Sequence, residues 1–184
     1  MKLHKTSTDS LLLSDFCNLS EEDEVLEIGC GEGYIMSSHP CCSFFLSVDI
    51  NQEYISSWIK KKKIKDHFFM VADARILPQI LKKNFTAVIC NPPYYKVESG
   101  RISPFYSRAV ARHELALKLE DVFAVSRLLL KKKGRLYMIH LFSRLQEIKN
   151  LARNYGFNIE EIRPGSSDRK PEQVPEQVLI VLRY

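Results

Sequence analysis

Short apolar segments rich in β-branched and aromatic residues alternate with longer amphipathic segments along most of this chain. Such alternation predicts an α/β fold, in which helices cover both faces of a mostly parallel sheet. Ligands of sheets of this kind bind at the carboxyl ends of the strands. By composition, strands are expected over Val25–Ile28, Phe44–Val48, Phe68–Val71, Ala87–Cys90, Leu136–His140, Ile159–Ile162 and Val178–Leu182.

Helices are expected where apolar residues recur at helical spacing. In "LEDVFAVSRLLLKKKG" (119–134), the lysines and Gly134 are typical of a helix end with a left-handed glycine cap. The segment "SRLQEIKNLARNYG" (143–156) is expected to end at Gly156. In "NQEYISSWIKKKK" (51–63), the apolar residues expected to share one helical face are Tyr54, Ile55, Trp58 and Ile59.

Length and composition favour one domain. With 184 residues and 45% hydrophobic composition, we expect a single domain over 1–184, with an N-terminal segment (1–21) before the core (22–184). No stretch is apolar enough for a signal peptide or a membrane span, so we expect a cytoplasmic protein. The five cysteines lack a paired C-x-x-C spacing, which favours reduced thiols and predicts no metal site.

The positive charges are clustered. The net charge is +5, and cations gather at Lys60–Lys65 and at Lys131–Arg135. Clusters of this kind can contact phosphates, as in a nucleic acid. A lysine run is more often the solvated end of a helix, so both interpretations stay open.

Glycines recur at alternate positions directly after the first expected strand, in "LEIGCGEGYI" (26–35). Gly29, Gly31 and Gly33 would let the backbone bend sharply and approach a ligand closely. Glu27 at the strand end would repel a diphosphate but attract an ammonium. S-adenosylmethionine carries an α-amino group, so this loop favours that cofactor over a dinucleotide.

Acidic residues also end the next two strands. Asp49 lies where a carboxylate would accept both ribose hydroxyls of an adenosine. Asp73 is placed to accept from the adenine amine, with Ile50 and Ala74 lining the ring faces. Each aspartate could instead cap a helix, but acids at successive strand ends favour a cofactor site.

The fourth strand is followed by "NPPYYK" (91–96). The prolines at 92 and 93 stiffen the chain, so the Asn91 side-chain oxygen and a neighbouring backbone carbonyl can accept both hydrogens of one planar NH2 group. Two such acceptors would stabilise the positive charge that develops as the nitrogen gains a methyl group. Tyr94 offers a flat face for a base turned out of its stack.

These motifs carry a resemblance. "EIGCGEG", "VDI", "ADA" and "NPPYYK" resemble the motifs of class I S-adenosylmethionine-dependent methyltransferases that act on exocyclic or amide nitrogen. With "TSTDSLLLSDF" and "ARHELALKLEDV" added, the pattern resembles the bacterial tRNA1(Val) adenine-N6-methyltransferase family over nearly the whole chain.

The resemblance implies a Rossmann-like fold with a seven-stranded sheet whose last strand is antiparallel. It also implies a short first helix, because the stretch 33–49 is shorter than the family usually carries. Cofactor contacts are implied for Glu27, Ile28, Gly29, Gly31, Gly33, Asp49, Ile50, Asp73, Ala74 and Asn91, and in second rank for Thr8 and Asp9. The amine site would consist of Asn91, Pro92, Pro93 and Tyr94, and the expected substrate contacts are Tyr94, Tyr95, Lys96, Arg101, Arg108, Arg112, His113 and Glu114.

The expected function is therefore N6-methylation of adenine in RNA, with tRNA as the expected partner and S-adenosylmethionine as the cofactor. N5-methylation of a protein glutamine uses the same acceptor geometry and stays open. A cofactor-binding, RNA-associated subunit without activity is the alternative outside the enzymes. We expect a monomer, while a dimer and a protein partner that holds the substrate stay open.

Overall fold

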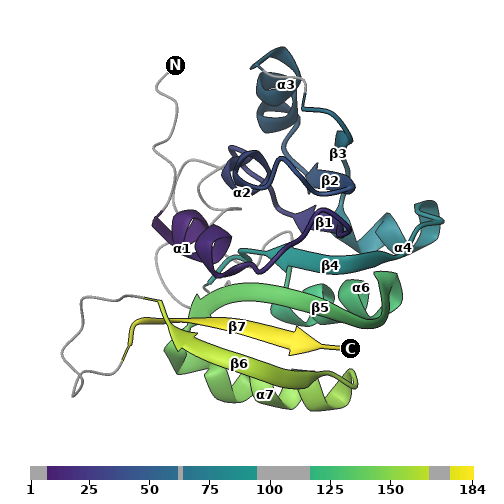
Figure 1. The fold of residues 1–184 in the computed structure, drawn as a ribbon. Coiled ribbons are helices and arrows are strands. Elements are labelled where there is room, and N and C mark those ends of the chain that lie inside the picture. Colours follow the sequence, from purple (N-terminus) through teal and green to yellow (C-terminus); the bar gives the residue numbers. More distant parts are fainter. Residues whose placement is uncertain (1–7, 62–63, 95–116, 166–174) are drawn as a thin grey trace.

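The computed structural model describes residues 8–61, 64–94, 117–165 and 175–184 (Figure 1). These residues form a seven-stranded sheet in the order β3-β2-β1-β4-β5-β7-β6, in which β7 runs antiparallel to both of its neighbours. The α/β fold and the antiparallel last strand are thus confirmed. The strands are β1 (Glu24–Ile28), β2 (Phe44–Asp49), β3 (His67–Val71), β4 (Phe85–Cys90), β5 (Leu130–Leu141), β6 (Asn158–Pro164) and β7 (Gln177–Arg183).

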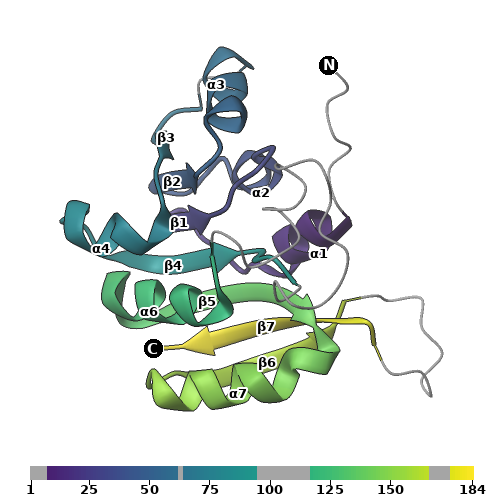
Figure 2. The ribbon, with the colours of Figure 1, turned by 180° about the vertical axis from the view of Figure 1, so that it is seen from behind.

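Helices cover both faces of this sheet, with α1 and α2 on one face and α6 and α7 on the other (Figures 1 and 2). α2 has only five residues, as its short sequence implied. The helices are α1 (Thr8–Phe16), α2 (Tyr34–Ser38), α3 (Gln52–Lys61), α4 (Leu77–Ile80), α6 (Leu119–Leu129) and α7 (Leu145–Asn154), with 3-10 turns η1 (Ala74–Ile76) and η2 (Phe142–Arg144).

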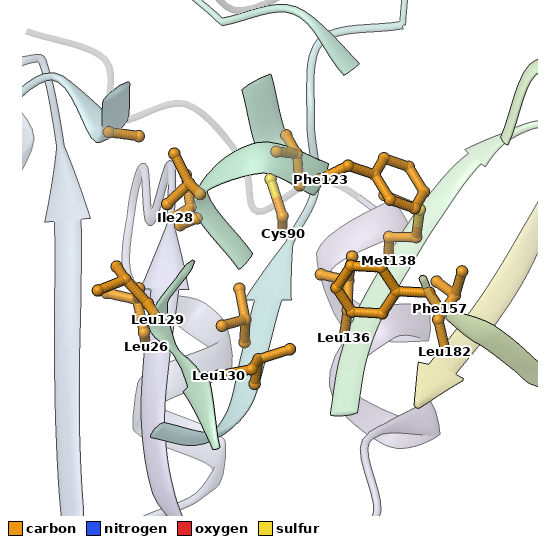
Figure 3. Packing of buried hydrophobic residues seen from close by; sticks show 14 of the residues in the cluster. Leu26, Ile28, Cys90, Phe123, Leu129, Leu130, Leu136, Met138, Phe157 and Leu182 are labelled. Carbon is orange, nitrogen blue, oxygen red and sulfur yellow. The ribbon is translucent and has the colours of Figure 1, made fainter. Parts of the chain in front are cut away.

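Successive residues of the central strands point to opposite faces of the sheet, and on each face they pack in a separate apolar core. Leu136 and Met138 of β5 belong to the larger core, together with Phe123 of α6 (Figure 3). Tyr137 and Ile139 point to the other face, where they pack in a second core with α1. Because β5 is buried on both faces, its sequence is almost continuously apolar from Leu136 onward.

The lysine run before Gly134 lies in a strand and not at a helix end. α6 ends at Leu129 and β5 begins at the next residue, and Lys133 has the positive φ, of 66°. A Cβ at Gly134 would lie 2.9 Å from the Lys131 carbonyl oxygen and 3.1 Å from that of Thr86 in β4. The expectation of a capping glycine was wrong, because glycine is required here for the close approach of two backbones.

The other helix ends agree better with the sequence. Gly156 has φ 76° and follows α7, and the Phe157 N–H donates to the Ala152 carbonyl across this turn at 2.8 Å.

In α3, Ile55 is buried and Trp58 packs against the second core. Ile59 was placed wrongly on that face, because its side chain is 62% exposed.

None of the helices in the described ranges has the length and apolar character that crossing a membrane would need. All five cysteines are free thiols, and only Cys41 among them is exposed. His39 lies directly after α2 and close in sequence to Cys41. Its Nε2 contacts the Oγ of Ser14 in α1 at 3.3 Å. It therefore helps to hold α1 against α2.

Candidate cofactor and substrate site

Strand register gathers the predicted site residues at one edge of the sheet. In the parallel ladder, Ile28 lies between Val48 of β2 and Cys90 of β4. The residues that follow, Gly29 and Asn91, therefore leave the sheet side by side, next to Asp49 at the end of β2. This is the carboxyl edge, where ligands of parallel sheets bind.

The glycine loop after β1 needs its glycines for two different reasons. Gly29 and Gly31 have φ of 74° and 49°, and nothing lies within 4 Å of the place where a Cβ would stand on either. A ligand can therefore approach this backbone closely. Gly33 has φ 66°, but a Cβ there would lie 2.5 Å from the Trp58 ring, so its glycine serves packing against α3.

Asp49 fixes the path of this loop. Its Oδ2 accepts from the Gly31 N–H and its Oδ1 from the Asn51 N–H, both at 2.8 Å. Burial raises the pKa of Asp49 in spite of these donors. Asn51 caps α3 through its own side chain, which accepts from the Glu53 N–H at 2.9 Å. Asp49 is thus not the helix cap, and its carboxylate instead ties the glycine loop to the end of β2.

Glu27 is a buried carboxyl group in the middle of the sheet. It is 2% exposed, and the Ser47 hydroxyl donates to its Oε2 at 2.8 Å. Burial raises its pKa to about 8, with a smaller contribution from the nearby charge of Asp49. In the described part of the chain, no lysine or arginine forms an ion pair with it. A buried carboxyl without a cation fits a ligand that brings an ammonium group.

Asp73 is already engaged in the structure. It caps η1 by accepting from the Arg75 N–H at 2.9 Å, and its carboxylate forms an ion pair with the Arg75 guanidinium at 2.5 Å. That pairing lowers the pKa of Asp73. Ile50 is 49% exposed, as a residue lining a ligand ring would be, whereas Ala74 is buried.

Ile28 contributes to the core and not to an open surface. The residue is 1% exposed and its side chain packs in the larger apolar cluster (Figure 3).

Asn91 and Pro92 leave β4 with acceptors that no other described residue engages. Asn91 is half-buried, and no hydrogen bond in the described part of the chain involves its side-chain amide or the Pro92 carbonyl. Pro92 is buried and Pro93 half-buried, which holds the segment against the sheet. The proposed pair of oxygens therefore remains available to an incoming NH2 group.

Tyr94 is held from several sides. Its hydroxyl donates to Asp9 Oδ2 at 2.8 Å, and its ring centroid lies 5.3 Å from that of His140. Arg144 donates from Nη1 to the Tyr94 carbonyl at 3.2 Å and forms an ion pair with Glu147 at 2.8 Å. Asp9, assigned to the cofactor by the resemblance, thus contacts the expected stacking residue instead.

Sequence reasoning missed His140, Arg144 and Glu147. His140 is the penultimate residue of β5, the strand beside β4, so the rule that sites gather at carboxyl ends could have indicated it. Burial, and then the charge of Arg144, lowers the pKa of His140 to about 3, so the ring is neutral at physiological pH. Its Nδ1 accepts from the Leu141 N–H at 2.8 Å, which places the proton on Nε2.

Thr8, the first residue of α1, is exposed. Within the described ranges it makes no contact with the other residues of this site. The other expected substrate contacts lie outside the described residues. They are Tyr95, Lys96, Arg101, Arg108, Arg112, His113 and Glu114.

No family model matches the chain. Curated relatives do match, and three of them are named tRNA1(Val) (adenine(37)-N6)-methyltransferase. The Shewanella amazonensis protein is 34% identical over 113 residues, which cover 58% of this chain and 48% of that protein. The Vibrio vulnificus protein is 27% identical over 173 residues (90% and 71%), and that of Aliivibrio fischeri is 25% identical over 189 residues (96% and 76%). The chain thus spans between about half and three quarters of the length of these relatives.

Solved structures share the fold. An S-adenosylmethionine-dependent methyltransferase from Mesorhizobium loti superposes with a TM-score of 0.68 at 12% identity, covering 97% of this chain and 99% of that one. The ribosomal protein L11 methylase of Lactobacillus delbrueckii gives 0.65 at 13% identity (99% and 79%). A Haloferax volcanii methyltransferase in complex with the activator Trm112 gives 0.68 at 14% (96% and 88%). The Rossmann-like methyltransferase fold and the resemblance in sequence are both confirmed.

Proposed function

We propose that this chain is an S-adenosylmethionine-dependent methyltransferase that modifies the exocyclic N6 of adenine in RNA, with tRNA as the expected substrate. The observation that carries the proposal is the placement of two unengaged acceptors, the Asn91 amide oxygen and the Pro92 carbonyl, beside a glycine loop with a buried, unpaired carboxyl. The names of the curated relatives support the same reaction.

The residues around the glycine loop fit the cofactor. Glu27 would bind the α-amino group, which supplies the missing positive partner of its carboxyl. Asp49, whose oxygens each use one lone pair on the loop, would accept from the ribose hydroxyls. Ile50 and Ala74 would line the adenine, with Asp73 at its amine. S-adenosylmethionine supplies a methyl group that its sulfonium charge activates.

Asn91 and Pro92 would orient the acceptor nitrogen. Their two oxygens accept both hydrogens of the adenine amine, so its nitrogen is aimed at the cofactor side of the edge. The same oxygens stabilise the positive charge that grows on the amine during transfer, and no strong base is needed beforehand. Tyr94, which Asp9 and Arg144 fix in place, would support the base.

The test follows labelled methyl groups from S-adenosylmethionine into RNA and, separately, into protein from cells that lack this chain. We expect label in N6-methyladenosine. Asn91→Ala should reduce the rate at least about a hundredfold, because it removes one charge-stabilising acceptor. The variant should still bind S-adenosylhomocysteine. The matched control is Asn154→Ala, on the exposed end of α7, which should be fully active.

Other outcomes decide between the alternatives. Label in N5-methylglutamine would replace the proposal with protein glutamine methylation. If the cofactor binds but neither pool is labelled, the chain is a subunit without activity of its own. If label enters RNA only when cell extract is added, a protein partner holds the substrate.

A further inference from the structure

An open hollow of about 530 Å³ lies at the edge of the sheet opposite the glycine loop. It forms where β4 and β5 begin and where the antiparallel β7 ends, near the point marked C in Figure 1. The polar residues that line it are Asn84, Arg127, Lys131, Lys132, Lys133 and Tyr184.

Positive charge dominates this hollow. Glu24, the first residue of β1, is shared by Lys131 and Lys83, and these hydrogen bonds lower the pKa of Glu24. Lys132 and Lys133 are exposed and have no acidic partner in the described part of the chain. The hollow therefore keeps two cations, Lys132 and Lys133, that no carboxylate within the described ranges neutralises.

The backbone beneath these lysines is fixed by the sheet. The Lys133 N–H donates to the Tyr184 carbonyl at 2.7 Å, and the Tyr184 N–H donates to the Gly134 carbonyl at 2.9 Å. Lys133 keeps φ 66°, a conformation that costs a lysine free energy and turns the chain at this point. The run is thus a shaped rim and not a frayed helix end.

A flat surface stands beside the charges. The Arg127 guanidinium lies over the Tyr184 ring, 4.1 Å from its centroid, and Leu128 next to it is 62% exposed. A guanidinium stacked on a ring still presents its outer face and its N–H donors. Arginine in this arrangement suits a phosphate or a nucleotide ring.

We propose that this hollow binds the sugar–phosphate backbone of the RNA substrate, at a place remote from the target base. The inference rests on the proposed function. β5, with 12 residues, connects the two edges and spans up to about 36 Å at the usual rise per residue. A short hairpin seated at the catalytic edge cannot reach the hollow, whereas a folded RNA of tRNA size can.

The test compares two RNA probes: a full transcript of tRNA1(Val), and the isolated hairpin that contains adenine 37. The variant is Lys132→Gln with Lys133→Gln, which removes both positive charges and keeps a polar, unbranched side chain at each position. The matched control, Lys149→Gln with Arg153→Gln, removes as much charge from exposed positions on α7. Equilibrium binding of each probe is measured over a range of salt concentrations, together with initial methylation rates.

We expect the hollow variant to bind the full transcript roughly tenfold more weakly, with the slope of log affinity against log salt reduced by about 1.5. KM for the transcript should rise while kcat and the affinity for the hairpin stay unchanged. Unchanged binding of the transcript, an equal loss for the hairpin, or an equal loss in the α7 control would overturn the inference. If the wild type methylates neither probe, the proposed function fails, and the binding arm still tests the hollow.

Discussion

Burying a carboxyl group between two strands costs free energy unless a positive charge compensates it. Among the residues that the structure describes, Glu27 has only the Ser47 hydroxyl as a hydrogen-bond partner, and its pKa of about 8 reflects its burial. In the folded protein without ligand, the group holds its proton over a pH range in which the unfolded chain has released it. The residue thus opposes folding above about pH 4.5, and the proposed ammonium ligand would offset this cost.

We predict that Glu27→Gln acts with opposite signs on stability and on binding. The unfolding free energy of the wild type falls relative to the variant as pH rises from about 4.5 to about 8, because the folded state keeps a proton that the unfolded state loses. The gap should reach on the order of 4 kcal/mol. Urea denaturation of both proteins at pH 5, 7 and 9 measures this gap in unfolding free energy. Contributions from the other titrating groups cancel when the variant is subtracted from the wild type.

The same variant should bind S-adenosylhomocysteine roughly ten- to a hundredfold more weakly, because glutamine cannot form a charge-assisted bond to the α-amino group. Calorimetry at pH 7 measures this. Undiminished affinity would show that Glu27 does not contact the ligand, even if the stability effect is found.

Arg144 acts on the site through Tyr94. Its guanidinium forms an ion pair with Glu147 while donating to the Tyr94 carbonyl, and its side chain is only 10% exposed. A lysine keeps the charge but cannot make both contacts at once. We predict that Arg144→Lys lowers kcat about tenfold, through misplacement of the segment after Asn91. Affinity for S-adenosylhomocysteine should not change, and a parallel loss of both would indicate general unfolding instead.

At the scale of elements, glycine is required at two positions for different physical reasons: Gly134 within β5 and Gly156 in the turn after α7. Gly134 has no room for a Cβ between β4 and β5, while Gly156 has open space but φ 76°. A side chain at Gly134 would clash with its neighbours, whereas a side chain at Gly156 would be strained by the left-handed backbone conformation.

Substitutions at these glycines should therefore rank differently. We predict that Gly134→Ala costs about 1 to 3 kcal/mol by overpacking, and that Gly134→Asn costs more. At Gly156, alanine should cost about 1 kcal/mol, and asparagine should cost less, because asparagine tolerates the left-handed region. Denaturant midpoints of the four variants give the ranking. An equal ranking at both positions would contradict the assignment.

At the scale of the whole molecule, the charges are divided between the two edges of the sheet. The carboxyl edge presents Glu27, Asp49 and Asp73, which suits a cationic cofactor, and the opposite edge presents the lysines of β5. The net charge of +5 then favours long-range attraction of a polyanion. Within the described ranges, this arrangement would keep the proposed cofactor and the proposed RNA backbone contact at opposite edges of the sheet.

We predict that RNA binding weakens steeply as salt rises, with a linear fall of log affinity against log salt, while S-adenosylhomocysteine binding hardly changes. The cofactor contacts are buried and few, so salt screens them little. Filter binding for RNA and calorimetry for the small ligand, at salt concentrations from low to physiological, measure both. RNA affinity that is independent of salt would exclude backbone phosphates as the main contacts.

The sequence by itself determined the fold, and it predicted which residues would gather at the candidate site. Strand-like segments, the glycine turn and the acids at strand ends specified a parallel sheet with its ligands at one edge, because these signals are local and obey the periodicity of strands and helices. Gly29, Gly31 and Asp49 follow their strands closely, so their meeting point could be predicted without knowing any packing.

Only the tertiary structure decided what depends on contacts between distant segments. Lys131–Lys133 looked like a helix end, but pairing with β4 and β7 draws them into β5 and leaves their charge around a hollow. Tyr94 meets Asp9, 85 positions away, and Arg144, 50 positions away. Contacts between residues so far apart in sequence leave no local sequence pattern, because only the strand order of the folded sheet brings the residues together.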